Sequence, residues 1–302
     1  MNTRVHCSLL TLPADLPLCR RLARIARAGF DGVQTTPPTA AQLPRFAAAL
    51  EESGLAASGC AHVPEDCSAE PIFERAAAAG MVSLNAQVDG YWRDDAWQDA
   101  RIRHLLALGE QYGLPFFLET HRHRLTQDLR RTLALVDRHP DLLLCGDFSH
   151  YTVMAELRAP WPTEWAAALR YLARRCHEVH LRLNNGQNIQ DPVPAVGPAQ
   201  RAEFEALWSA ARDSSPDVLF TTELLPADLG YDHIDLTGAP ISDIWTDSLT
   251  LLAWTADRPR GPAGTADGRD QSAPVPRVLD SPRDAASAGR GGRRRGWCPA
   301  SG

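Results

Sequence analysis

Four polar side chains stand at the ends of short apolar runs in the second half of this chain. The runs are residues 115–119, 142–147, 178–181 and 218–223. The side chains are Glu119, Asp147, His180 and Glu223. Three carboxylates and one imidazole are the oxygen and nitrogen donors that hard and borderline divalent cations accept. If the runs are neighbouring strands of one barrel, their ends direct these donors to a single point. The pattern therefore predicts a site for one divalent metal ion.

The elements that would position these donors recur along the whole chain. Segments with apolar residues at helical spacing, such as Leu18, Leu22 and Ile25, lie between short strand-like runs. The strand-like runs are residues 4–10, 31–36, 55–62, 81–88, 115–121, 142–149, 177–183 and 217–224. Eight alternations of strand and helix predict an α/β fold, a single closed (β/α)8 TIM barrel with its chemistry at the C-terminal strand ends.

Glycine and threonine residues support these boundaries. Gly29, Gly54, Gly80 and Gly113 each follow a helical segment and precede a strand, where a left-handed C-terminal cap belongs. Thr39, Thr126 and Thr163 are candidate N-caps of the helices that follow them. A doubly wound open sheet is the alternative fold, but the first strand is not followed by the G-x-G-x-x-G pattern of a nucleotide site.

The length of 302 residues exceeds the roughly 250 residues of a typical barrel. From residue 259 the chain is rich in Gly, Pro and Arg and poor in large apolar residues. We therefore predict a TIM barrel catalytic domain over residues 1–258 and a disordered tail over residues 259–302. The tail carries eight Arg against four Asp, a net charge of +4, so the rest of the chain, with the total at −6, carries −10.

This composition excludes several classes of function. An acidic body repels phosphate backbones, so we expect no nucleic-acid partner. Every basic residue is Arg, and the absence of Lys excludes Schiff-base chemistry and a Walker-type phosphate loop. Seven cysteines without a C-x-x-C pair favour a reducing compartment. With no signal-like N-terminus and no stretch of about 20 apolar residues, we expect a cytoplasmic protein with no membrane partner.

The residues around the four donors resemble a known family. Glu119-Thr120-His121, Asp147-Phe148-Ser149-His150, His180-Leu181-Arg182 and Thr222-Glu223 look like the strand ends of the xylose isomerase-like TIM barrel superfamily, in its branch of sugar phosphate isomerases and epimerases. The resemblance covers about residues 1–257. It is specific in the second half, whereas His62, Asn85 and Gln87 in the first half echo the family only loosely.

The resemblance implies one divalent ion, Mn²⁺, Mg²⁺, Co²⁺ or Zn²⁺, bound by Glu119, Asp147, His180 and Glu223. It also implies that Glu119 and Glu223 exchange protons with a small sugar or polyol substrate. The expected reaction is isomerisation or epimerisation of a sugar, sugar phosphate or polyol ketone through an enediolate, which a cation stabilises.

Four further residues are candidate substrate contacts, namely His150, Arg182, His121 and His62. Arg182 and His121 each lie two residues beyond a donor and so point to the same side of the strand. Each has an alternative structural role: His150 can orient Asp147, Arg182 can pair with a carboxylate, and His121 and His62 can be packing residues.

Several alternative functions stay open at this stage. A dehydratase or other lyase would use the same metal site. An apurinic-endonuclease-like hydrolase is disfavoured, because Val193-Pro194-Ala195 replaces the expected Asp-x-His pair and the first half offers Asn85 and Gln87 instead of a histidine. A non-catalytic binding barrel and a homo-oligomeric assembly are further alternatives. Without Lys, the hydride-shift route of the classical xylose isomerases is disfavoured.

Overall fold

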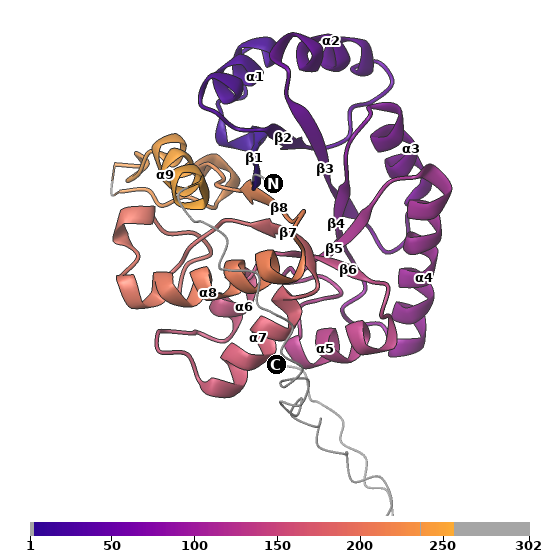
Figure 1. Cartoon of the computed structure of the whole chain (residues 1–302), viewed down its shortest axis with the longest axis vertical. Helices are drawn as coiled ribbons and strands as arrows, with labels where there is room; N and C mark the ends of the chain where they lie inside the picture. The colour runs from indigo at the N-terminus through magenta and orange to yellow at the C-terminus, as the bar shows by residue number, and fades with distance from the viewer. Residues whose placement is uncertain (1–2, 236, 257–302) are drawn as a thin grey trace, which may run out of the picture. The chain divides into compact units, whose positions relative to one another are not determined.

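In the computed structural model, residues 3–235 and 237–256 are described, and they contain a closed barrel of eight parallel strands. Each strand pairs with its neighbours in chain order, and β1 pairs with β8 to close the barrel (Figure 1). The strands are β1 (Arg4–Ser8), β2 (Gly32–Thr35), β3 (Ala56–Val63), β4 (Leu84–Val88), β5 (Phe116–Glu119), β6 (Leu143–Gly146), β7 (Cys176–His180) and β8 (Leu219–Thr222). The predicted α/β class and all eight strand positions are confirmed.

Helices form the layer around the barrel (Figure 1). The α-helices are α1 (Leu18–Arg27), α2 (Leu43–Ser53), α3 (Glu70–Ala78), α4 (Asp95–Tyr112), α5 (Leu129–Arg138), α6 (Ser149–Met154), α7 (Thr163–Ala173), α8 (Pro198–Ser214) and α9 (Ile244–Ala256). Short 3₁₀ helices are η1 (Leu9–Thr11), η2 (Val193–Ala195) and η3 (Ala227–Leu229). The predicted tail, residues 259–302, lies outside the described residues, so the domain boundary stays a prediction. Within the described part of the chain, no helix combines the length and apolar character that crossing a bilayer requires.

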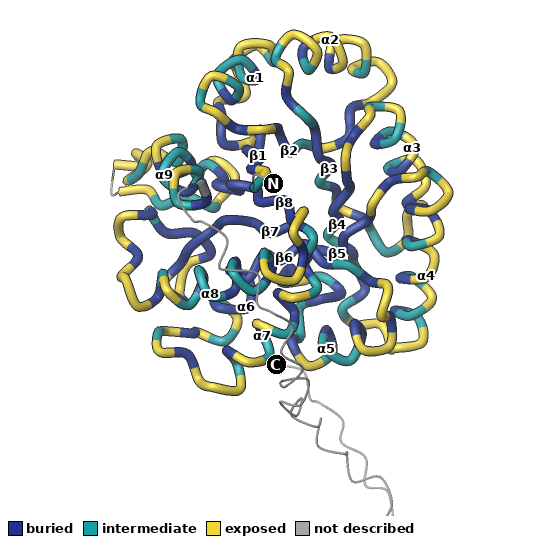
Figure 2. The backbone as a smooth tube through the Cα atoms, viewed as in Figure 1, coloured by how far each residue is buried: buried dark blue, intermediate teal, exposed yellow. Residues whose placement is uncertain are grey.

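The helices pack through one apolar stripe each and leave their other face in water. In α1, Leu22 and Ile25 are completely buried, whereas Arg20 and Arg27 are exposed. Figure 2 shows the same contrast around the ring, with buried strands inside and exposed outer helix faces. Burial of apolar surface against the barrel therefore stabilises each βα unit.

The glycine caps are confirmed and the threonine caps are wrong. Gly54 and Gly113 end α2 and α4 in the left-handed conformation, with φ of 68° and 59°. At the helix starts, however, the side chains of Asp94 and Asp128 cap α4 and α5. Thr126 instead joins the loop to the end of β5, because its hydroxyl donates to the carbonyl of Glu119 at 2.7 Å. The prediction fails at Thr126 because its hydroxyl is bonded to the backbone at the end of β5 and not to a helix N–H group.

The barrel interior below the mouth is polar as well as apolar. His6 on β1 reaches across to Ser58 on β3, with 2.9 Å between Nδ1 and Oγ. A Cβ at Gly32 would lie 2.3 Å from Nε2 of His6, so only glycine fits at this point of β2. One step nearer the mouth, Gln34 on β2 donates to Glu178 on β7 at 2.6 Å. A layer of hydrogen-bonded polar groups therefore lies in the barrel interior directly beneath the mouth.

Candidate metal centre

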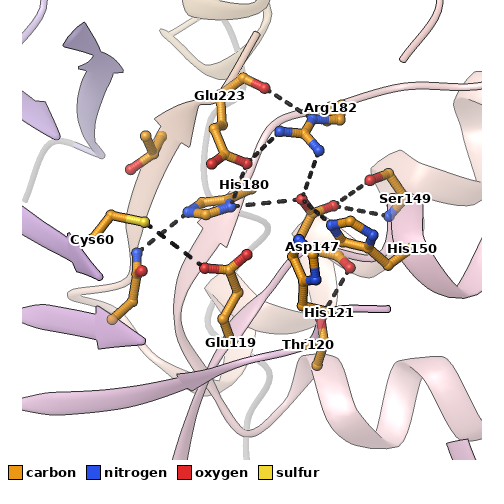
Figure 3. A network of polar contacts seen from close by, with 12 residues as sticks. Cys60, Glu119, Thr120, His121, Asp147, Ser149, His150, His180, Arg182 and Glu223 are labelled. Carbon is orange, nitrogen blue, oxygen red and sulfur yellow. Dashed lines mark hydrogen bonds and ion pairs between the residues drawn. The ribbon is translucent and has the colours of Figure 1, made fainter. Parts of the chain in front are cut away.

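Four side chains from consecutive strands meet at the mouth of the barrel (Figure 3). Glu119 ends β5 and His180 ends β7, and Asp147 and Glu223 come directly after β6 and β8. Each offers a ligand atom, and these four atoms all lie within 4.8 Å of one another. All four side chains are buried. The structure thus brings together the complete set of predicted metal donors.

The ring of His180 faces the other donors through one nitrogen. Its Nδ1 lies 2.9 Å from Oε2 of Glu223 and 3.7 Å from Oδ2 of Asp147. Neither Nδ1 of His180 nor Oδ2 of Asp147 has an aligned hydrogen-bond partner among the described residues. Both atoms have charged neighbours, but neither makes the aligned hydrogen bond that a buried polar atom usually has. A divalent cation placed between them would satisfy both, so the residues present fit a metal ion.

Arg182 holds two of the carboxylates. Its guanidinium lies 2.5 Å from Oε2 of Glu223 and 3.2 Å from Oδ2 of Asp147, and its Nε donates to the carbonyl of Glu223 at 2.9 Å. The side chain is only 1% exposed and lies 5.3 Å from the ring centre of Tyr231. A planar cation bound on several sides has one orientation. Arg182 therefore positions the two carboxylates and presents positive charge at the site.

The surroundings shift the pKa values of the donors in different directions. Burial raises the pKa of Glu119 to about 8. Burial acts in the same direction on Asp147, but the charge of Arg182 and the contact with His180 outweigh it and hold the pKa of Asp147 well below its usual range. Burial alone would lower the pKa of His180, yet Cys145 and Glu223 raise it well above its usual range.

Without a metal ion, the raised pKa values of Glu119 and His180 favour the protonated form of both groups. A single divalent cation that displaces both protons leaves the net charge of the buried site unchanged. This balance avoids the large cost of an uncompensated charge in a buried site. It is a second physical reason that the donors fit an ion of charge +2.

The layer beneath His180 contains two residues that sequence reasoning missed. Gln34 places its Nε2 2.6 Å from Oε1 of Glu178 and 3.1 Å from Nε2 of His180, and Thr221 donates to the same oxygen of Glu178 at 3.0 Å. These contacts hold the far nitrogen of the ring and turn Nδ1 toward the carboxylates. Glu178 could have been found, because it lies two residues before His180 on the same strand face, but Gln34 had no local signal.

Glu119 is held by two residues from the first half of the barrel. Gln87 on β4 donates to Oε1 of Glu119 at 3.1 Å, and Sγ of Cys60 on β3 lies 4.0 Å from Oε2. Burial raises the pKa of Cys60 well above its usual range, so it stays a neutral thiol. Both oxygens of Glu119 thus keep capacity for a further ligand.

Two of the predicted substrate contacts, His121 and His150, lie beside the metal donors (Figure 3). Their ring centres are 3.8 Å apart, and Nε2 of His150 lies 3.5 Å from Oδ2 of Asp147. Burial lowers the pKa of His121 to about 4 and that of His150 well below its usual range. Both rings are therefore neutral at physiological pH and can accept as well as donate.

His62 is the predicted site residue that the structure does not bring into this cluster. Its side chain is 44% exposed and lies 3.0 Å from Oδ1 of Asp89, which also pairs with Arg124 at 3.2 Å. His62 pairs in register with Gln87 on the neighbouring strand β4. Its position near the rim of β3 places it next to a surface ion pair instead of the buried donors.

The structure is a closed parallel α/β barrel with buried carboxylates and an imidazole at its C-terminal strand ends. The family described as Xylose isomerase-like TIM barrel matches residues 22–191 of this sequence. The chain belongs to this family, as the strand-end residues predicted. No curated protein matches the sequence significantly.

Solved structures with the same fold include three enzymes. The 3-keto-D-glucoside 4-epimerase YcjR from E. coli is 15% identical, with a TM-score of 0.57 over 84% of this chain and 99% of its own. The probable 3-DHS dehydratase AsbF from Bacillus anthracis is 15% identical, with a TM-score of 0.59 over 83% and 98%. A sugar phosphate isomerase/epimerase from Parabacteroides distasonis ATCC 8503 is 12% identical, with a TM-score of 0.56 over 85% and 95%. At such low sequence identity, these comparisons show that the fold is shared and say nothing of the activity.

Proposed function

We propose that this protein is a divalent-metal-dependent isomerase or epimerase that acts on a small sugar, sugar phosphate or polyol ketone by proton transfer next to the carbonyl. The observation that carries the proposal is the convergence of Glu119, Asp147, His180 and Glu223 within 4.8 Å in a buried site beside Arg182. The similar epimerase and sugar phosphate isomerase folds support the substrate class. When bound, a divalent ion would supply Lewis acidity toward the substrate carbonyl.

Two carboxylates in this arrangement are suited to moving a proton. Glu119 and Glu223 come from β5 and from the end of β8, so the strands that carry Asp147 and His180 separate them along the barrel wall. A substrate bound between them would present its C–H to one carboxylate and the opposite face of the same carbon to the other. General acid–base transfer of this kind contributes about 10²–10⁴-fold in rate.

The surrounding cations and donors suit the charge that develops in such a reaction. Arg182 is fixed by Glu223 and Asp147 and would stabilise an enediolate oxygen that forms beside it. His150 and His121 are neutral and would bind substrate hydroxyls. Burial of these groups lowers the local dielectric, which strengthens each electrostatic contact between them and a developing charge.

Exchange of the substrate α-proton with solvent tests the proposal. The metal-stripped protein is reloaded with Mn²⁺ and incubated in D₂O with ketohexoses, their phosphates, 3-keto-glycosides and inososes, and proton loss is followed by NMR. We expect metal-dependent deuterium incorporation for one class of substrate, lowered about 10²–10⁴-fold by Glu119→Gln or Glu223→Gln. Glu164→Gln, on the exposed face of α7, is the matched control that keeps full activity.

The products separate the remaining outcomes. Epimerised or isomerised sugar supports the proposal, whereas loss of water from the same substrate would assign a dehydratase, which shares the first deprotonation. Absence of exchange with every substrate, in a protein shown to contain its metal, would contradict the proposed function and favour a binding barrel.

A further inference from the structure

A basic pocket lies at the rim of the barrel, in the half of the molecule opposite to the metal donors in the chain order. Its volume is about 920 Å³, and it is lined by the loops after β1 and β2 and by residues of α1, α2 and α3. We propose that this pocket binds the phosphate group of a small phosphate monoester through Arg21, Arg45 and Arg75. The inference does not depend on the proposed function, because none of the residues that line the pocket is a metal donor.

The three guanidinium groups come from three consecutive helices. Arg21 and Arg45 lie near the starts of α1 and α2, and Arg75 lies in the second half of α3. Helices α1 and α2 are neighbours in the ring (Figure 1). The lining contains one acidic residue, Asp15, so three Arg against one Asp give it a net charge of +2. This charge stands out, because residues 1–258 together carry −10.

The side chains of these three arginines make no hydrogen bond or ion pair with the described residues. The Nε atoms of Arg21 and Arg75 are nevertheless buried. Two other arginines with a buried Nε, Arg101 and Arg175, donate through their terminal nitrogens to backbone carbonyls. Burial lowers the pKa of Arg21, and no carboxylate opposes the shift. Buried donors are usually paired, so an anion in the pocket would supply acceptors that the folded chain does not.

The starts of α1 and α2 carry the opposite charge from the one that stabilises a helix. Acidic residues are favoured in a first turn, because the N-terminus of a helix bears a partial positive charge. Neither helix has an acidic residue in its first turn or a side-chain cap, and Arg20 and Arg45 lie there instead. Leu18 and Gln42, at these two helix starts, line the pocket. A bound anion would compensate the arginines and the free N–H groups together.

Charge and shape favour a phosphate monoester over a carboxylate. A phosphate monoester carries about −1.5 to −2 at neutral pH, which matches the +2 of the lining, whereas a carboxylate would compensate half of it. A guanidinium group binds phosphate oxygens through two parallel N–H groups. The opposite wall is apolar and includes the buried residues Pro37, Pro38 and Phe46, which would contact the carbon skeleton of the ligand. The volume lies within the range of about 300–1,000 Å³ of small-molecule sites.

Binding to the metal-free protein tests this inference without turnover. The full chain is stripped of metal and dialysed, because a bound metal ion would itself attract phosphate. Glycerol phosphate and inorganic phosphate are then titrated by isothermal titration calorimetry at constant ionic strength. We expect saturable binding of one molecule per chain, weakened about 10–100-fold by Arg21→Gln or Arg75→Gln, since each variant loses charge-assisted hydrogen bonds. Arg27→Gln, at the exposed end of α1, removes the same charge outside the pocket and should keep the full affinity.

The variants also give the results that would overturn the pocket. These are the absence of saturable binding at millimolar phosphate, or equal affinities in Arg21→Gln, Arg75→Gln and Arg27→Gln. Either result would leave the proposed function intact, since that function is measured by α-proton exchange at the metal donors. If Arg21→Gln does not fold, as judged by circular dichroism, Arg45→Gln measures the same pocket from an exposed position on α2.

Reloading the protein with Mn²⁺ identifies the source of the phosphate group. If it belongs to a sugar phosphate whose carbonyl reaches the metal, Mn²⁺ should tighten the binding of that sugar phosphate, and Arg21→Gln should remove the gain. If it belongs to a ligand separate from the substrate, the affinity for glycerol phosphate should be the same with and without Mn²⁺, and no sugar phosphate should gain affinity. Both results support the phosphate pocket, and the first also identifies the substrate as phosphorylated.

Discussion

The two halves of the barrel contribute different chemistry to its interior. Strands β5–β8 supply the charged groups, namely Glu119, Asp147, Glu178, His180, Arg182 and Glu223. Strands β1–β4 supply uncharged polar groups, namely His6, Gln34, Ser58, Cys60, Asn85 and Gln87. The second half is arranged so that its charges compensate one another, and the first half supplies hydrogen bonds to them. The second half therefore supplies the candidate metal donors, and the first half orients them through hydrogen bonds.

The largest expected effect comes from removing a donor in the charged half. Asp147→Asn keeps the shape but removes the charge that faces His180 and Arg182 at 3.7 Å and 3.2 Å. Mn²⁺ affinity should fall by more than about 100-fold, beyond the 10–100-fold that residues supporting a ligand typically cost. Isothermal titration calorimetry measures this loss. An unchanged affinity would mean that the cation does not bind between β5 and β8.

Removing the positive charge of Arg182 should mainly lower the free energy of unfolding of the metal-free protein. Arg182→Met leaves Asp147 and Glu223 buried without their counter-charge, and breaking such a pair costs about 3–5 kcal/mol. Urea unfolding of the metal-free protein measures the change in the free energy of unfolding. Added Mn²⁺ should restore part of it, because the ion supplies the missing positive charge. Equal stability of the variant and the unchanged protein without metal would show that the charges in this half do not depend on one another.

The first half has its own pH dependence, through His6. Burial, followed by the charge of Arg4, lowers the pKa of His6 to about 3, from 6.5 in an exposed histidine. Between these values the unfolded chain binds a proton that the folded chain does not, so stability is present above pH 6.5 and is lost as the pH falls toward 3. From pH 6.5 to 5 this amounts to about 2 kcal/mol. The variant His6→Gln should show a slope that is smaller by this amount in urea unfolding, since His121 and His150 keep their own contributions, and an identical slope would refute the assignment.

A supporting amide in the first half should alter the metal site without altering the fold. Gln34→Ala removes the contact to Nε2 of His180 at 3.1 Å and the contact to Glu178 at 2.6 Å. The imidazole loses its fixed orientation, so Mn²⁺ affinity should fall about 10–100-fold. Thr39→Ala, in the exposed loop after β2, is the matched control and should keep full Mn²⁺ affinity. Asp31→Ala is unsuitable as a control, because the carboxylate of Asp31 accepts a hydrogen bond from the backbone N–H of Val5.

These differences also explain how much of the molecule was predictable from its sequence. The strands were predictable because short apolar runs and positive-φ glycines such as Gly54 and Gly113 record local requirements of the backbone. Glu119 and Asp147 stood out because a charge at the end of an apolar run is conspicuous. Gln34 did not, since an amide within a strand acquires its role from Glu178, 144 residues away. The metal donors of the charged half could thus be predicted from their neighbours in the sequence. The role of a residue in the supporting half, such as Gln34, depends on contacts that form only when the barrel closes.

The smallest expected effect concerns His62, the one predicted site residue outside the cluster. Its ring is 44% exposed, and its contact with Asp89 at 3.0 Å resembles a surface ion pair, which contributes about 0–1 kcal/mol. His62→Ala should therefore change Mn²⁺ affinity and α-proton exchange by less than about 5-fold, measured by calorimetry and NMR on the same preparation. A loss as large as that of Asp147→Asn would show that β3 reaches the substrate in the working enzyme, and it would place charged chemistry in both halves of the barrel. A small change would keep the division between a charged half and a supporting half, with His62 on the rim outside both.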